Sequence, residues 1–176
     1  MPRRATRAVL VRNVADALTA CRAAAAARSI VTLISPPGAG LFAGPVWFKA
    51  LTAITRRESG AGPGDARFVL DCADAPGAVL AAIRARVEAC AFSGNAKARA
   101  RLAAIAERVG VALVDPPAEA FELTQNSDFG ALVAWFSSPA ASLQRSGRSA
   151  KRTATQIPAP TRRGSGIRPF RGANRP

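Results

Sequence analysis

Residues 7–34 read RAVLVRNVADALTACRAAAAARSIVTLI, and this stretch decides the fold. Its two apolar runs, 8–11 and 30–34, are short and rich in β-branched residues, which is typical of strands. Between them, apolar residues recur at three- and four-residue spacing after Asn13, a favoured helix N-cap. The second run is continuously apolar, as expected for a strand in a parallel sheet that is covered on both faces. The stretch therefore predicts a strand, a helix and a second strand parallel to the first.

The same unit recurs along the chain. Further strands are predicted within RFVLDC (67–72), RVEACAF (86–92) and VGVALV (109–114), with a break near Arg86 before the second of these. A loop is predicted at 58–66, and a helix cap at Gly110. A short helix near 129–136 is predicted to start at Asn126 or Ser127. Intervening helices are predicted with these inward residues: Trp47, Ala50, Leu51 and Ile54, then Val79, Ala82 and Ile83, then Ala98, Leu102, Ile105 and Val109.

Alternation of strands and helices predicts an α/β fold with right-handed crossovers. We expect a five-stranded, mainly parallel sheet with flanking helices, in either a flavodoxin-like order or a half-barrel. Residues 1–139 are predicted to form this single domain. Residues 140–176 contain almost no large apolar side chain, so they are predicted to be a disordered, Arg-rich tail.

Composition excludes several kinds of chemistry. The chain has no His and no Tyr, which removes His general bases, His-ligated metals and Ser–His or Cys–His nucleophile pairs. Its three cysteines, Cys21, Cys72 and Cys90, lack the CxxC spacing of a zinc site, so reduced thiols and a cytoplasmic location are expected. No apolar stretch approaches the ~20 residues of a membrane span.

Parallel sheets bind ligands beyond the carboxyl ends of their strands, and polar residues follow several predicted strands. A glycine-rich segment, 38–44, could bring backbone N–H groups to a phosphate, although its GxGxxxG spacing is looser than the dinucleotide fingerprint. Ser93–Lys97 could hold an anion at a helix start. The residues predicted to bind an anionic ligand are Asn13, Ser35, Gly38, Gly40, Ser93, Asn95 and Lys97.

Asp71 and Asp74 are the candidate catalytic residues. Two carboxylates at a strand end could act as acid and base on a phosphorylated or carbonyl substrate, as in a lyase or isomerase, or could bind Mg²⁺. A structural alternative is that both cap the next helix. The sequence leaves the identity of any cofactor open and assigns no residue as a metal ligand.

The 25 Lys and Arg outnumber the 11 acids, and the excess is concentrated at the C-terminus. Residues 140–176 carry nine basic side chains and no acid, whereas 1–139 carry 16 basic and 11 acidic ones. Such a segment could bind nucleic acid through phosphate contacts, and an acidic membrane or protein would serve equally. The candidate nucleic-acid-binding residues are Arg145, Arg148, Lys151, Arg152, Arg162 and Arg163.

Three stretches, VTLISPPGAGLFAGPVWFKAL (31–51), VLDCADAPGAVLAAIRARVEACAFSG (69–94) and RARLAAIAERVGVALV (99–114), resemble a group of small uncharacterised bacterial α/β proteins. The resemblance implies a compact α/β domain in a bacterial cytoplasm and brings no activity. From the residues, we expect a non-catalytic domain that binds a ligand or partner, with an anionic, phosphate-bearing ligand at the carboxyl edge of the sheet. An Asp71/Asp74 enzyme and a nucleic-acid-binding tail are the alternatives.

Overall fold

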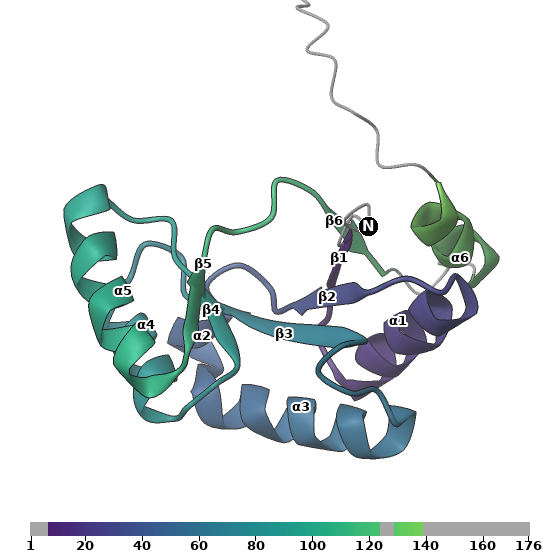
Figure 1. Ribbon diagram of the computed structural model, residues 1–176, viewed down its shortest axis with the longest axis horizontal. Coiled ribbons are helices and arrows are strands. Elements are labelled where there is room, and N and C mark those ends of the chain that lie inside the picture. The colour runs from purple at the N-terminus through teal and green to yellow at the C-terminus, as the bar shows by residue number, and fades with distance from the viewer. Residues whose placement is uncertain (1–6, 124–128, 139–176) are drawn as a thin grey trace, which may run out of the picture. The chain divides into compact units, whose positions relative to one another are not determined.

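The computed structural model describes residues 7–123 and 129–138, all of which belong to the first of two units, Met1–Ala141 and Ser142–Pro176. Its core is a six-stranded, fully parallel sheet in the order β5-β4-β3-β2-β1-β6 (Figure 1). The strands are β1 Arg7–Leu10, β2 Val31–Ile34, β3 Ala66–Asp71, β4 Ala89–Ala91, β5 Ala112–Val114 and β6 Ala120–Glu122. The helices are α1 Val14–Ala26, α2 Ala39–Phe42, α3 Gly44–Ser59, α4 Pro76–Arg84, α5 Ala96–Val109 and α6 Phe129–Ser137.

The predicted α/β class and the parallel sheet are confirmed, whereas the strand count and the flavodoxin-like order are not. The sheet has a sixth strand, β6, which pairs with β1 and forms an edge. The first five strands are neighbours in chain order, as in a β/α barrel, whereas a flavodoxin-like sheet places its second strand outside its first.

Local chemistry sets the element boundaries largely as the sequence predicts. The side chain of Asn13 accepts a hydrogen bond from the Asp16 N–H and caps α1, and Asn95 caps α5 through the Ala98 N–H. Gly110 ends α5 in the left-handed conformation, with φ of 75°. Arg86 also has a positive φ, 54°, at the break between α4 and β4.

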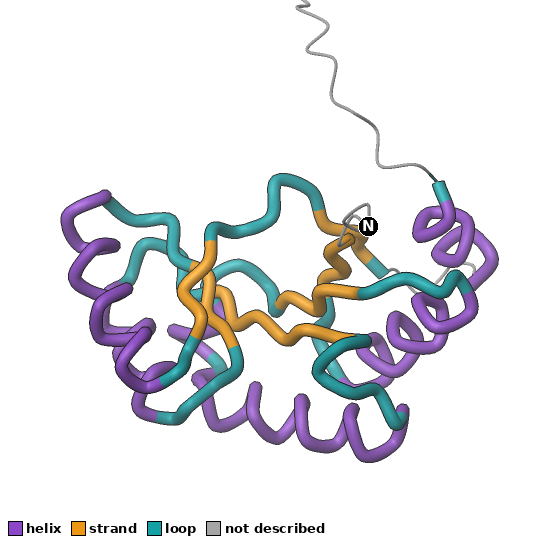
Figure 2. Tube along the Cα trace, viewed as in Figure 1, coloured by secondary structure: helices purple, strands orange, loops and turns teal. Residues whose placement is uncertain are grey.

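The helices pack on one face of the sheet. Side chains of all six described helices share a single buried cluster with the strand residues that point to that face, including Val9, Leu33, Phe68 and Phe92. The opposite face has its own smaller cluster, and every member of it described here comes from a strand: Ile34, Val69, Ala89 and Ala91, with Ala112, Val114 and Ala120 beside them. No helix in the described ranges contributes to that second face, which we call the inner face (Figure 2).

The connection between β5 and β6 requires the sheet to be rolled. These strands lie at opposite edges, five strand spacings apart, so a flat sheet would separate them by about 24 Å. Only residues 115–119 join them, and six Cα-to-Cα steps reach at most about 21 Å. The edges must therefore approach each other, and the connection passes over the open side of the sheet (Figure 1).

Some predicted positions are wrong in detail. The buried residues of α3 are Phe48, Leu51 and Thr55, while Ala50 is exposed. Ile105 of α5 is 41% exposed, because Leu102 and Ala106 face the core instead. Asn126 and Ser127 lie outside the described residues, as does 140–176. Among the helices that the structure describes, none has the length and apolar character to cross a membrane.

Candidate functional site

The carboxyl edge of the sheet is organised around Asp71, which is 7% exposed at the end of β3. Its Oδ1 accepts hydrogen bonds of 2.8 Å from both the Gly38 N–H and the Ala73 N–H. Its own N–H donates to the Ser35 hydroxyl at 2.9 Å. Asp71 thus joins the turn after β2 to the turn after β3, where Ala73 adopts a φ of 48° that non-glycine residues rarely take.

Asp71 and Asp74 therefore differ in environment. Asp74 is exposed in the turn before α4, whereas Asp71 is buried and engaged with backbone N–H groups. Neither caps α4, whose N-cap residue, Ala75, makes no side-chain capping bond. The carboxylate of Asp71 performs a structural task, and no described hydrogen bond joins it to a partner that could exchange a proton with it.

The glycine-rich segment forms a short helix, α2, rather than an open phosphate-binding turn. The Gly38 N–H is directed at Asp71, whose negative charge opposes the approach of an anion. Gly40 is buried against β3, and a Cβ placed there would lie 2.8 Å from the Cys72 Sγ and 3.2 Å from the Asp71 carbonyl oxygen. The close packing of α2 on β3 is enough to require glycine at this position.

The remaining predicted ligand-binding residues lie at the same edge but not in one cavity. Asn13 and Asn95 cap helices with their side-chain oxygens. Ser93 is exposed and its N–H donates to the Ala73 carbonyl, which ties β4 to the turn after β3. Lys97 is exposed on the first turn of α5. These groups mainly hold the turns of this edge together.

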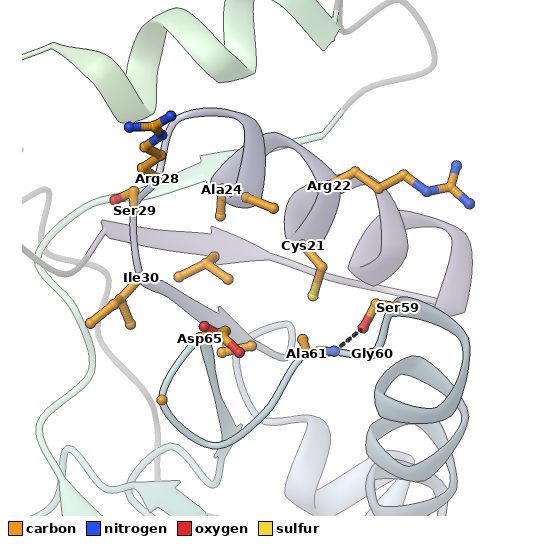
Figure 3. A pocket seen from close by; sticks show the side chains of 14 residues that line it. Cys21, Arg22, Ala24, Arg28, Ser29, Ile30, Ser59, Gly60, Ala61 and Asp65 are labelled. Carbon is orange, nitrogen blue, oxygen red and sulfur yellow. Dashed lines mark hydrogen bonds between the residues drawn. The ribbon is translucent and has the colours of Figure 1, made fainter.

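A cavity of about 550 Å³ lies at the opposite, amino-end edge of the sheet (Figure 3). It lies between the ends of α1 and α3, and the Cys21 thiol points toward Ser59 within it (Figure 3). Burial raises the pKa of Cys21, so its thiol is protonated at neutral pH. Asp65 holds the loop below by accepting from the Gly62 N–H at 2.9 Å. In β/α architectures this edge serves stability rather than ligand binding.

The other two cysteines form a buried pair on the helix-covered face. Cys72 and Cys90 are both fully buried. Contact with the Cys90 thiol, together with burial, raises the pKa of Cys72. The same thiol–thiol hydrogen bond lowers the pKa of Cys90, but both residues are fully buried, so a substrate cannot reach either sulfur and the pair is not suited to covalent catalysis.

A second cavity, of about 160 Å³, lies on the inner face and was not anticipated from the sequence. It is lined by strand residues of β1, β2, β3 and β5 and by the β5–β6 connection: Ala8, Thr32, Arg67, Val69, Val114, Asp115 and Pro117. Thr32 and Arg67 are direct register partners on neighbouring strands. Within residues 7–123 and 129–138, neither side chain makes a hydrogen bond or ion pair. Asp115, at the rim, is paired with Arg99 at 3.0 Å.

Arg67 carries the positive charge of this cavity, and the alternation of β3 explains its position. Phe68 points into the core among the helices, so its neighbour Arg67 points to the inner face. The signal in the sequence is a basic residue within a predicted strand, directly before the apolar run FVL (68–70). It predicts a binding residue only when it is known that no described helix covers the inner face.

The predicted tail residues, from Arg145 to Arg163, lie outside the described part of the chain, so their role stays a prediction. Comparisons of this chain with protein-family models, with curated proteins and with solved structures gave no match.

Proposed function

We propose that this chain is a non-catalytic α/β half-barrel that binds a small anionic, phosphate- or carboxylate-bearing ligand through Arg67 and Thr32. The observation that carries the proposal is the inner-face cavity, which Arg67 and Thr32 line as register partners whose side chains make no hydrogen bond or ion pair among the described residues. Arginine matches the geometry of phosphate and carboxylate oxygens because it offers several N–H donors in one plane.

The size of the cavity limits the ligand. Its volume of about 160 Å³ is several times the roughly 30 Å³ that a water molecule occupies in the liquid. A phosphate or a short carboxylate fits this space, while a dinucleotide does not. Val69, Val114 and Pro117 provide an apolar wall, which suits a ligand with a small hydrocarbon part.

The absence of catalysis rests on chemistry rather than on the cavity. The sequence holds no His and no Tyr, the Asp71 carboxylate accepts two backbone N–H groups, and burial keeps the thiol of Cys21 protonated. The carboxyl edge of the sheet is less suited to an anion than the inner face, because the Gly38 N–H already donates to the Asp71 carboxylate.

Isothermal titration with inorganic phosphate and with acetate tests the proposal. We expect saturable binding to the full chain that Arg67→Ala abolishes and Thr32→Val weakens, because each removes hydrogen-bond donors from the cavity. Arg84→Ala is the matched control, since Arg84 is an exposed arginine in the last turn of α4, remote from the cavity lining. Equal loss of binding in the Arg67 and Arg84 variants would indicate nonspecific attraction to a basic protein and would refute the proposed site.

A further inference from the structure

Three large apolar side chains protrude where α2 meets α3. Leu41 is 62%, Phe42 72% and Val46 78% exposed, and no other large apolar residue in the described part of the chain exceeds 46%. They lie within six residues of one another, and we call them the apolar patch. Single exposed apolar residues are ordinary on protein surfaces, but a cluster of this kind usually marks a surface that binds something.

The backbone beneath the apolar patch is well ordered by packing. Gly38 and Gly44 adopt left-handed conformations at the two ends of α2, and Gly40 presses against Cys72. The N–H of Leu41 donates to the Gly38 carbonyl at 2.8 Å. The exposure of the patch is therefore a fixed property of this corner and not the result of a loose segment.

The apolar patch is surplus to the needs of the fold. The core face of α3 is already supplied by Phe48 and Leu51, which are at most 3% exposed. Neither Leu41, Phe42 nor Val46 lines any of the cavities described above. These side chains therefore face water. Their transfer from water into an apolar surrounding would be favourable.

Charge distinguishes the two possible partners of the apolar patch, which are a second copy of the chain and a lipid surface. The chain carries a net charge of +14, so two copies repel each other, and the small patch offers less than a stable dimer interface needs. No acid occurs between Asp16 and Glu58 in the sequence, so the segment that carries the patch adds no negative charge, and the nearby Asp71 carboxylate is buried and bound to the Gly38 N–H. Lys49 is exposed one helical turn after Val46, and the first turn of α3 has no acidic residue. An apolar tip with an exposed lysine beside it, on a chain of strongly positive net charge, is complementary to an anionic lipid surface.

We propose that the apolar patch inserts into the interfacial region of an anionic phospholipid bilayer and holds this protein on the membrane surface. Leu41, Phe42 and Val46 supply the apolar contact. Lys49 and the basic residues of 140–176 supply electrostatic attraction, which adds to that contact because stable attachment usually needs two weak signals. This role is separate from ligand binding at Arg67.

Cosedimentation of the full chain with vesicles tests the proposal. We expect binding to vesicles of phosphatidylcholine mixed with phosphatidylglycerol, and much weaker binding to phosphatidylcholine alone. The triple variant Leu41→Ser, Phe42→Ser, Val46→Ser should lose roughly tenfold or more in partition, because it removes most of the inserted apolar surface. Ile105→Ser is the matched control, since Ile105 is a singly exposed apolar residue on α5 and its loss should leave binding unchanged.

Tryptophan fluorescence gives a second measurement that leaves the apolar patch intact. The chain has two tryptophans, and Trp47 follows Val46 directly. In a Trp135→Phe variant, anionic vesicles should shift the Trp47 emission to the blue, and brominated phospholipid should quench it. Three results would overturn the proposal: vesicle binding that survives the triple substitution, vesicle binding without any change at Trp47, or no vesicle binding together with patch-dependent self-association in light scattering.

Discussion

Replacement of Asp71 by alanine should destabilise the fold strongly, because this carboxylate holds two turns at once. Its Oδ1 accepts from the Gly38 N–H and the Ala73 N–H, both at 2.8 Å, and the residue is only 7% exposed. Ala73 adopts a φ of 48°, a conformation that the bond from its N–H helps to hold. Asp71→Ala removes both bonds and leaves two partly buried donors without their acceptor.

The expected loss follows from these contacts. A hydrogen bond to a charged group contributes about 1.5–3 kcal/mol, and water recovers part of this at a site that is not fully buried. We therefore expect Asp71→Ala to lower the free energy of unfolding by about 2–4 kcal/mol. Asp71→Asn should cost less, about 1–2 kcal/mol, because the amide oxygen can still accept from both N–H groups although it lacks the charge.

Equilibrium urea unfolding, followed by circular dichroism, measures both values. Asp74→Ala is the matched control, because Asp74 is an exposed aspartate of the same turn and its loss should change stability by less than about 0.5 kcal/mol. If Asp71→Ala were as stable as the Asp74 variant, the carboxylate would not be holding these turns. The structural role assigned to it would then be wrong, and a chemical role for Asp71 would again be open.

Three further outcomes are expected. Gly40→Ala should destabilise the protein by about 1–3 kcal/mol in urea unfolding, because its Cβ would meet the Cys72 Sγ at 2.8 Å, whereas Gly77→Ala, in an open helical position, should stabilise it by about 0.5–1 kcal/mol. Arg56→Ala should lower stability by about 2–3 kcal/mol in the same assay, since Arg56 forms two bonds of 2.9 Å with the Glu88 carboxylate; an unchanged midpoint would contradict this. Cys72 and Cys90 should react with Ellman's reagent only as fast as the chain unfolds, because both are fully buried, whereas Cys21 lines the cavity between α1 and α3; rapid labelling of more than one thiol in the native protein would contradict this.

The sequence predicted the first five strands because each combines β-branched or apolar residues with a clear turn signal. The cap at Asn13 and the break at Arg86 followed from the same local chemistry, which acts over a few residues and can be recognised without the fold. The sixth strand had no such signal. β6 is only three residues long, half-exposed, and formed through its pairing with β1, more than a hundred residues earlier in the chain.

The candidate site was harder to predict for a related reason. The sequence placed polar residues correctly at the carboxyl ends of strands, but could not tell that the Asp71 side chain would bind the N–H groups of both Gly38 and Ala73. The cavity at Arg67 depends on which face of the sheet the helices leave open. That is a property of the strand order, which follows from contacts between distant segments.

One sequence pattern could have chosen between the two strand orders. Along β4 and its continuation, the residues pointing to the inner face are Ala89 and Ala91, while Cys90 and Phe92 point to the helices. A doubly wound sheet needs side chains on both faces that are large enough to pack against helices. A rolled sheet brings the concave faces of its strands toward one another, so alanines at some inner positions leave room for the larger Ile34 and Val69. The alternation of alanine with larger residues in EACAF therefore favours a rolled, singly wound sheet. The substitution Ala89→Leu, which would crowd that side, should reduce the free energy of unfolding by about 1–3 kcal/mol, and unchanged stability in urea would show that the inner face has more space than this reasoning allows.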